Sequence, residues 1–213
     1  MSGAAHHCPF CLPADAEVLA QTDTARLLID LRPLCVGHVL VVPRIHVPSV
    51  AEAELSVREG TLGLAREAAT HLRTTFGEAG IYEHGGSPIC RPRSCQSGPT
   101  HAHLHVLPVA EDVLLDHQPD EPTGLRGPAH YLYQEIEDAT PSARQPLGPT
   151  IPRHLVRGRL QQTMAERGMR WLPMGAERRR HLTAIEETMR LFRFRDRTSE
   201  GARPSAHRLL VHL

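Results

Sequence analysis

Three histidines alternate with small or apolar residues over residues 101–108 (His-Ala-His-Leu-His-Val-Leu-Pro), and this run constrains the fold more than any other part of the chain. The alternation predicts a strand, because successive side chains of a strand point to opposite faces of a sheet. The imidazoles of His101, His103 and His105 should therefore share one face. Three adjacent imidazoles suit a metal site, or phosphoryl chemistry in which a neutral imidazole attacks phosphorus. A solvent-exposed, histidine-rich strand is the alternative interpretation.

Hydrophobic patterning predicts further strands and helices around this run. Apolar runs bounded by Gly and Pro predict strands within residues 18–28 and over residues 26–31, 37–43, 81–85 and 130–136. Apolar residues at helical spacing predict helices over residues 50–76, 153–166 and 177–194. Gly77 and Gly80 should end the first helix, since glycine commonly follows the last helical residue.

Composition and charge narrow the expected partners. The 213 residues include 24 basic and 24 acidic side chains, so the formal net charge is zero, and bulk electrostatic binding of nucleic acid or of an anionic membrane is not expected. The sequence has no apolar run long enough for a membrane helix, and residues 1–10 lack the pattern of a secretion signal. An odd number of cysteines, five, fits a reducing compartment, so we expect a cytoplasmic protein.

The histidine run resembles the His-x-His-x-His signature, with x apolar, of the histidine triad (HIT) family. The segment from Asp30 to His46 is similar to that family's order of aspartate, proline, Gly-His, apolar strand, Pro-Lys/Arg and histidine. The resemblance implies an α+β, HIT-like fold, with an antiparallel sheet of about five strands, a long helix and a homodimer that shares its sheet. Residues 1–112 would form this domain. Residues 113–213 would form a mostly helical extension, with one strand and about two helices, packed on the core or on the dimer.

The resemblance also implies a reaction and a nucleotide site. The middle histidine, His103, would attack the α-phosphorus of a purine nucleotide and form a covalent nucleotidyl-imidazole, while His105 would contact the phosphate and help to manage the proton. Asp30 would hold the ribose hydroxyls, and its apolar neighbours would line the base. The nucleotide-binding positions are expected to be Leu28, Ile29, Asp30, Leu31, Glu83, Ser97, Gly98 and His105.

The loop before the histidine run departs from the family pattern. Family members usually carry Gly-Gln-Ser/Thr-Val there, whereas this chain has Gln-Ser-Gly-Pro-Thr over residues 96–100. Gly98 takes the position of the usual hydroxyl, and Pro99 offers no backbone N–H. Ser97 is therefore the expected substitute for that hydroxyl.

Three functions follow as alternatives. The leading hypothesis is a nucleotide hydrolase that acts at the α-phosphate of a dinucleoside polyphosphate, phosphoramidate or adenylate. The second is a nucleotidyltransferase or phosphorylase, which passes the nucleotidyl group to phosphate or another acceptor. The third is a non-catalytic nucleotide-binding module, which the altered loop favours and an intact His103 disfavours. A role on nucleic acid is not expected, because the chain has no net positive charge.

Two cysteines at the start of the chain suggest a metal site. Cys8 and Cys11 have C-x-x-C spacing, which supplies half of a tetrahedral zinc site. By resemblance, His46 and His101 would complete it, giving a structural zinc ion and no cofactor for catalysis. The alternative is a reduced cysteine pair in a flexible N-terminus, with both histidines only hydrogen-bonded.

Arginines are frequent in the C-terminal half. The default interpretation is that they lie on solvated helix faces beside glutamates. The functional alternative is that Arg153 or Arg157 folds back over the pocket and holds a phosphate or sulfate of the leaving group.

Overall fold

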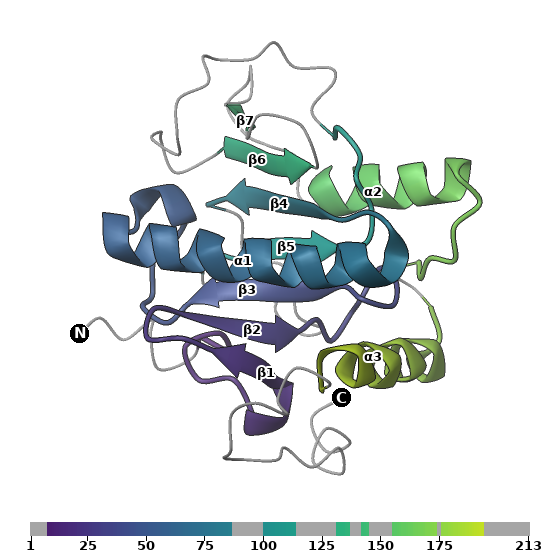
Figure 1. Ribbon diagram of the computed structural model, residues 1–213, viewed down its shortest axis with the longest axis horizontal. Coiled ribbons are helices and arrows are strands. Elements are labelled where there is room, and N and C mark those ends of the chain that lie inside the picture. The colour runs from purple at the N-terminus through teal and green to yellow at the C-terminus, as the bar shows by residue number, and fades with distance from the viewer. Residues whose placement is uncertain are drawn as a thin grey trace.

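One seven-stranded antiparallel sheet, in the order β1-β2-β3-β5-β4-β6-β7, organises the part of the chain that the structure describes (Figure 1). The structure is a computed structural model, and it describes residues 8–86, 100–113, 131–136, 142–144, 155–173 and 176–193. The strands are β1 Val18–Gln21, β2 Ala25–Ile29, β3 Val39–Pro43, β4 Gly80–Gly85, β5 Leu104–Leu107, β6 Tyr131–Ile136 and β7 Ser142–Arg144. The helices are α1 Leu55–Phe76, α2 Leu155–Glu166 and α3 Arg178–Arg193, with short 3-10 turns η2 Asp15–Glu17 and η3 Val50–Glu52.

The α+β class and the HIT-like order of five strands and a long helix are confirmed, but the C-terminal half departs from its predicted content. It contributes two strands to the described sheet, β6 and β7, where one strand was expected. β6 pairs with β4 along its whole length, from Gly80 opposite Ile136 to Gly85 opposite Tyr131. This half of the chain therefore extends the sheet in addition to supplying helices.

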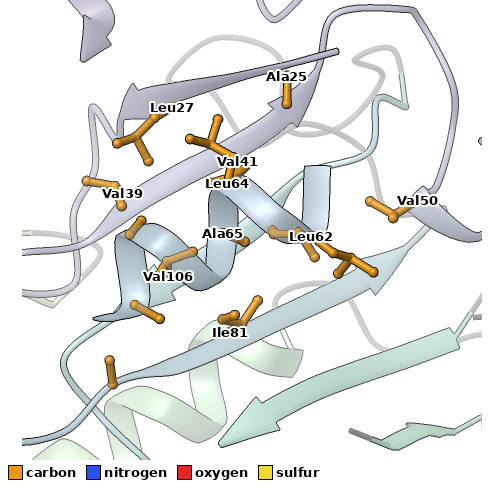
Figure 2. Packing of buried hydrophobic residues seen from close by; sticks show 14 of the residues in the cluster. Ala25, Leu27, Val39, Val41, Val50, Leu62, Leu64, Ala65, Ile81 and Val106 are labelled. Carbon is orange, nitrogen blue, oxygen red and sulfur yellow. The ribbon is translucent and has the colours of Figure 1, made fainter. Parts of the chain in front are cut away.

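The face of the sheet under α1 holds the main apolar core. Alternate residues of β2, β3 and β5 point to this face, because side chains alternate along a strand. Figure 2 shows these side chains gathered around Leu62, Leu64 and Ala65 of α1. The strand residues of this cluster include Ala25, Leu27, Val39, Val41, Ile81, Leu104 and Val106. The predicted alternation along the histidine run is therefore confirmed for its apolar positions.

The helix predicted over residues 50–76 begins later than expected. The N–H of Val50 donates to Glu83 and that of Ala51 donates to the hydroxyl of Tyr131, so these residues form the separate turn η3. α1 then starts at Leu55 and ends at Phe76, and Gly77 caps it with a φ of 89°, a left-handed conformation that glycine adopts without strain.

Helices cover both faces of the sheet. α3 packs beside α1, where Phe192 joins the main core. α2 lies on the opposite face, where Leu160 and Met164 pack with Tyr82 and Leu107. Among the described residues, we find no helix with the length and apolarity needed to cross a membrane.

Candidate functional site

The three histidines of the run gather on the face opposite α1. His101 and His103 precede β5, and His105 lies within it. The segment is held in place by the N–H of Ala102, which donates to the carbonyl of Val47 at 2.7 Å. The ring centroids of His103 and His105 are 5.1 Å apart, and all three histidines are buried. The side chains therefore lie together, as the alternation predicts.

A backbone carbonyl sets the tautomer of His103. Its Nδ1 lies 2.8 Å from the carbonyl oxygen of His101. A carbonyl oxygen only accepts hydrogen bonds, so Nδ1 must carry the proton. The lone pair of the neutral ring is then on Nε2, and this nitrogen can act as a nucleophile.

A second histidine sets the tautomer of His105. The N–H of Leu34 donates to His38 Nδ1 at 3.0 Å, which requires the His38 proton to be on Nε2. His38 Nε2 lies 3.0 Å from His105 Nδ1 and therefore donates to it. His105 consequently carries its own proton on Nε2 and can donate a hydrogen bond from there. His38 is the histidine of the Gly-His pair, and it was not among the residues predicted for the site.

Burial keeps these imidazoles neutral. It lowers the pKa of His103, and it lowers the pKa of His105 well below its usual value. Burial also lowers the pKa of His38 to about 4, although the Asp30 carboxylate opposes this shift. A neutral His103 retains its lone pair at neutral pH, which nucleophilic attack requires.

Asp30, at the end of β2, lies beside the histidines as an ionised carboxylate. Burial alone would raise its pKa, but the Arg157 guanidinium and the N–H of Arg32 hold that pKa well below its usual range. Arg157 Nη1 donates to Asp30 Oδ2 at 2.8 Å, and the N–H of Arg32 donates to Oδ1 at 2.8 Å. Asp30, His38 and His105 also lie close enough together to hold a metal ion. The Arg157 guanidinium already forms an ion pair with the carboxylate of this group, which disfavours a cation there.

The apolar residues around Asp30 divide between the two faces of the sheet. Leu28 packs with Phe10 on the histidine face, and the ring of Phe10 lies 5.5 Å from that of His103. Ile29 packs instead against α3, and Leu31 joins the same cluster. The prediction that Ile29 lines the base together with Leu28 is therefore wrong for this packing, because side chains alternate along β2. The prediction for Leu31, which lies beyond the end of β2, stays a prediction. Phe10 was missed, although it lies within the C-x-x-C motif that we singled out.

Glu83 is also misplaced by the sequence prediction. It pairs with Leu104 across β4 and β5, so its side chain points to the α1 face, away from His103. There it is fully buried, and it accepts hydrogen bonds from the N–H of Val50 and the hydroxyl of Tyr131. Its role in the described structure is to join η3 and β6 to the core.

Replacing Glu83 with glutamine is expected to remove a pH dependence of stability. Burial raises the pKa of Glu83 from 4.5 to about 7, even though its hydrogen bonds favour the ionised form. Between these values the folded state holds a proton that the unfolded state releases, so the free energy of unfolding falls as the pH rises. The difference in free energy of unfolding between Glu83→Gln and the unsubstituted protein should therefore shift in favour of Glu83→Gln by roughly 2–3 kcal/mol from pH 5 to pH 8.

Urea unfolding at both pH values measures this gain. Glu59→Gln is the matched control, because it removes the same charge from an exposed position of α1. A gain that is equally large in Glu59→Gln, or absent from Glu83→Gln, would contradict the assignment.

Cys8, Cys11, His46 and His101 converge on one point, as predicted for a metal site. Their ligand atoms all lie within 4.8 Å of one another. Cys8 Sγ is 3.2 Å from His101 Nδ1, and Cys11 Sγ is 3.3 Å from His46 Nδ1. Tetrahedral zinc, with bonds of about 2.3 Å to sulfur and about 2.0 Å to nitrogen, separates such ligands by about 3.5 Å. The cluster is therefore compatible with zinc.

The surroundings of the cluster orient its ligands. His101 Nε2 donates to the carbonyl of Pro43 at 2.9 Å, so the lone pair on Nδ1 faces the sulfurs. The N–H of Cys11 donates to the carbonyl of Cys8, which closes the turn between the cysteines. Arg26 Nη1 donates to the carbonyls of Phe10 and Cys11, both at 3.3 Å, and holds this turn on β2.

Three residues singled out from the sequence lie outside the described residues. Ser97 and Gly98 belong to the loop before the histidine run, and Arg153 precedes α2. The predictions for Ser97, Gly98 and Arg153 therefore stay predictions. The other arginine of that hypothesis, Arg157, does lie on the histidine face beside Asp30.

A comparison with known protein families finds one that matches part of this chain. A family model described as the HIT domain matches residues 13–112. An uncharacterized HIT-like protein of Borreliella burgdorferi is 28% identical over 109 residues, which cover 48% of this chain and 76% of that protein.

Solved structures of similar proteins were also found. A hypothetical histidine triad nucleotide-binding protein from Sulfolobus tokodaii is 14% identical, with a TM-score of 0.42, covering 90% of this chain and 96% of that one. A zinc-bound histidine triad family protein from Mycobacterium smegmatis is 21% identical, with a TM-score of 0.38, covering 55% of this chain and 84% of that one.

Proposed function

We propose, from the match of residues 13–112 to the HIT-domain family model, that this chain hydrolyses a purine nucleotide at the α-phosphate. The reaction passes through a covalent nucleotidyl-histidine intermediate on His103. The observation that carries the proposal is the 2.8 Å hydrogen bond from His103 Nδ1 to the carbonyl of His101. It keeps the proton on Nδ1 of a neutral ring and leaves the lone pair on Nε2, where a nucleophile needs it.

The first step transfers the nucleotidyl group to the protein. A bond forms between His103 Nε2 and the α-phosphorus, while the bond from phosphorus to the leaving group breaks. The leaving group takes the electron pair of that bond, and a phosphate leaving group needs no added proton at neutral pH. His105 donates a hydrogen bond from Nε2–H to the phosphate oxygens, which stabilises charge that develops in the transition state.

The second step returns the protein to its initial state. A water oxygen bonds to phosphorus, the bond from nitrogen to phosphorus breaks, and its electron pair returns to Nε2 of His103. The water releases its proton to solvent, and the nucleoside monophosphate departs. Asp30 accepts hydrogen bonds from the ribose hydroxyls, for which each carboxylate oxygen has a second lone pair, and Leu28 contacts the base.

The Cys8, Cys11, His46 and His101 cluster supports a structural zinc ion in this proposal. Four protein ligands leave no open position for a substrate, so the ion would stabilise the fold without taking part in the reaction. Because His101 is next but one to His103, the same ion would fix the backbone carbonyl that orients the nucleophile.

The proposed hydrolysis is tested by incubating the protein with a panel of adenosine and guanosine compounds in ¹⁸O-labelled water. The panel holds dinucleoside polyphosphates, phosphoramidates and adenylyl sulfate, each with and without added phosphate. We expect nucleoside monophosphate that carries one ¹⁸O atom, identified by mass spectrometry. An α-phosphorothioate of known configuration should react with retention at phosphorus, because each of the two displacements inverts it.

Other outcomes would replace the proposal. Nucleoside diphosphate that appears only with added phosphate would assign transfer to phosphate in place of hydrolysis. Inversion at phosphorus would exclude the covalent intermediate. Nucleotide binding without turnover of any compound would assign a binding module.

The homodimer implied by the resemblance stays a prediction for this chain. A sheet shared by two copies needs a strand with an unpaired edge. β6 of the same chain already occupies the outer edge of β4. Within the described residues the sheet ends at β1 and β7, so two copies would have to join their sheets at one of these strands.

A further inference from the structure

A helix from outside the HIT domain forms part of the wall beside the histidines. α2 packs Leu160 and Met164 against Tyr82 and neighbouring apolar residues. Tyr82 pairs with His105 in the ladder between β4 and β5, so both side chains point to the same face of the sheet. α2 therefore brings residues of the C-terminal half to the candidate nucleotide site.

Arg157 of α2 contacts Asp30 in this region. Its residue exposure is 8%, and Nη1 donates to Asp30 Oδ2 at 2.8 Å. Nη2 donates to the carbonyl oxygen of Arg32. Its Nε–H is buried and has no hydrogen-bond partner in the described structure. Leaving a buried donor without an acceptor is unfavourable, so this nitrogen has the properties of a ligand contact.

The charges around Arg157 favour an anionic ligand. The guanidinium acts electrostatically on His38, His103 and His105, where it adds to burial in lowering each pKa. These neutral imidazoles bring no positive charge to a phosphate, and the Asp30 carboxylate repels it. A buried guanidinium offsets that repulsion, and its planar fork can serve a carboxylate with one nitrogen and a phosphate with another.

Resting on the proposed function, we propose that Arg157 is a further nucleotide-binding residue, whose Nε–H binds a phosphate oxygen of the nucleotide. Nη1 meanwhile holds Asp30 in position for the ribose hydroxyls. The phosphate contact thus comes from the C-terminal half, whereas the nucleophile comes from the HIT domain. The C-terminal half thus takes a direct part in substrate recognition.

The test compares ligands with and without a phosphate. Affinities for AMP and adenosine, and for GMP and guanosine, are measured by calorimetry with the full-length protein and with Arg157→Gln. We expect Arg157→Gln to weaken nucleotide binding at least tenfold more than nucleoside binding, because the lost contact of Nη1 with Asp30 affects both ligands whereas the lost Nε–H affects only the phosphate. Arg157→Lys keeps the charge but lacks the Nε–H, so its loss of AMP affinity should be smaller than that of Arg157→Gln. Arg170→Gln, which removes the same charge from an exposed position after α2, should leave both affinities unchanged.

The controls separate the possible failures. Melting temperatures of the variants check that each is folded, and Arg157→Lys carries the comparison if Arg157→Gln does not fold. Equal losses of nucleotide and nucleoside affinity would overturn the inference, because Arg157 would then act only through Asp30. Unchanged nucleotide affinity would also overturn it. If the unsubstituted protein binds neither nucleotide nor nucleoside, the proposed function itself is contradicted, and the inference with it.

Discussion

Replacing His103 with alanine is expected to abolish nucleotide hydrolysis, with kcat/KM falling by a factor of roughly 10⁴ or more. The substitution removes the nitrogen that forms the covalent bond to phosphorus, and no neighbouring group replaces it in the proposed mechanism. His105 presents Nε2 with its proton attached, because His38 donates to its Nδ1. The rate of monophosphate formation, measured on the best compound of the panel, gives the effect directly.

Two further histidine variants make this result specific. His105→Ala should cost less, roughly 10²–10³-fold, because it removes a hydrogen-bond donor and leaves the nucleophile in place. His71→Gln is the matched control, since His71 lies on α1 and contacts the carbonyl of Leu191 on the other side of the sheet. It should retain full activity. An activity above about one hundredth of the original in His103→Ala would contradict His103 as the nucleophile.

Removing the metal site should lower stability by an amount visible in any thermal scan. We expect the purified protein to hold about one zinc ion per chain, and Cys8→Ser to hold none. Loss of an ion that is present at about 1,000 times its Kd removes about 4 kcal/mol of stability. For a chain of this size that loss corresponds to a decrease in Tm of roughly 8–16 °C. Metal analysis and scanning calorimetry measure the two quantities.

A second cysteine provides the control for this prediction. Cys35 is buried as Cys8 is, but it belongs to the apolar cluster under α2 and lies outside the four-residue metal cluster. Cys35→Ala should therefore keep its zinc, whatever it loses in packing. A chelator should reproduce the decrease in Tm in the unsubstituted protein and have no effect on Cys8→Ser. Purified protein that contains no metal, and whose Tm does not change with added zinc, would contradict the assignment.

The sequence predicts the local parts of the fold well, because they depend on residues close together in the chain. The alternation of the histidine run is a two-residue period, and it leads directly to three imidazoles on one face. α1 follows from helical spacing and a terminal glycine in the same way. The metal cluster was predictable from C-x-x-C spacing only with the help of the family resemblance, which supplied His46 and His101.

Errors in the predicted nucleotide site have a simple geometric origin. Resemblance assigned Leu28 and Ile29 to the same pocket, although neighbours on a strand face opposite ways. Applying the two-residue period to β2 would have kept Leu28 and Asp30 and excluded Ile29. Glu83 needed more information, because its direction depends on the register between β4 and β5.

Contacts between distant parts of the chain could not be derived from sequence periodicity. Arg157 and Asp30 are 127 positions apart, and no periodicity relates them. The pairing of β6 with β4 is equally non-local, and the intervening residues 86–130 carry no signal for it. Such contacts are decided by which surfaces remain to be covered once the local elements have formed.

The position of β6 has a consequence for the HIT domain as a separable unit. A chain cut after residue 112 would keep the three histidines of the run and the cluster of Cys8, Cys11, His46 and His101, but it would lose the strand that pairs with Gly80–Gly85. The outer backbone groups of β4 would then be open, and an open edge recruits strands from other molecules. Shortened forms of this protein would thus tend to aggregate or to exchange strands between copies. Insolubility of such a fragment would reflect its missing neighbour rather than a defect of the HIT domain.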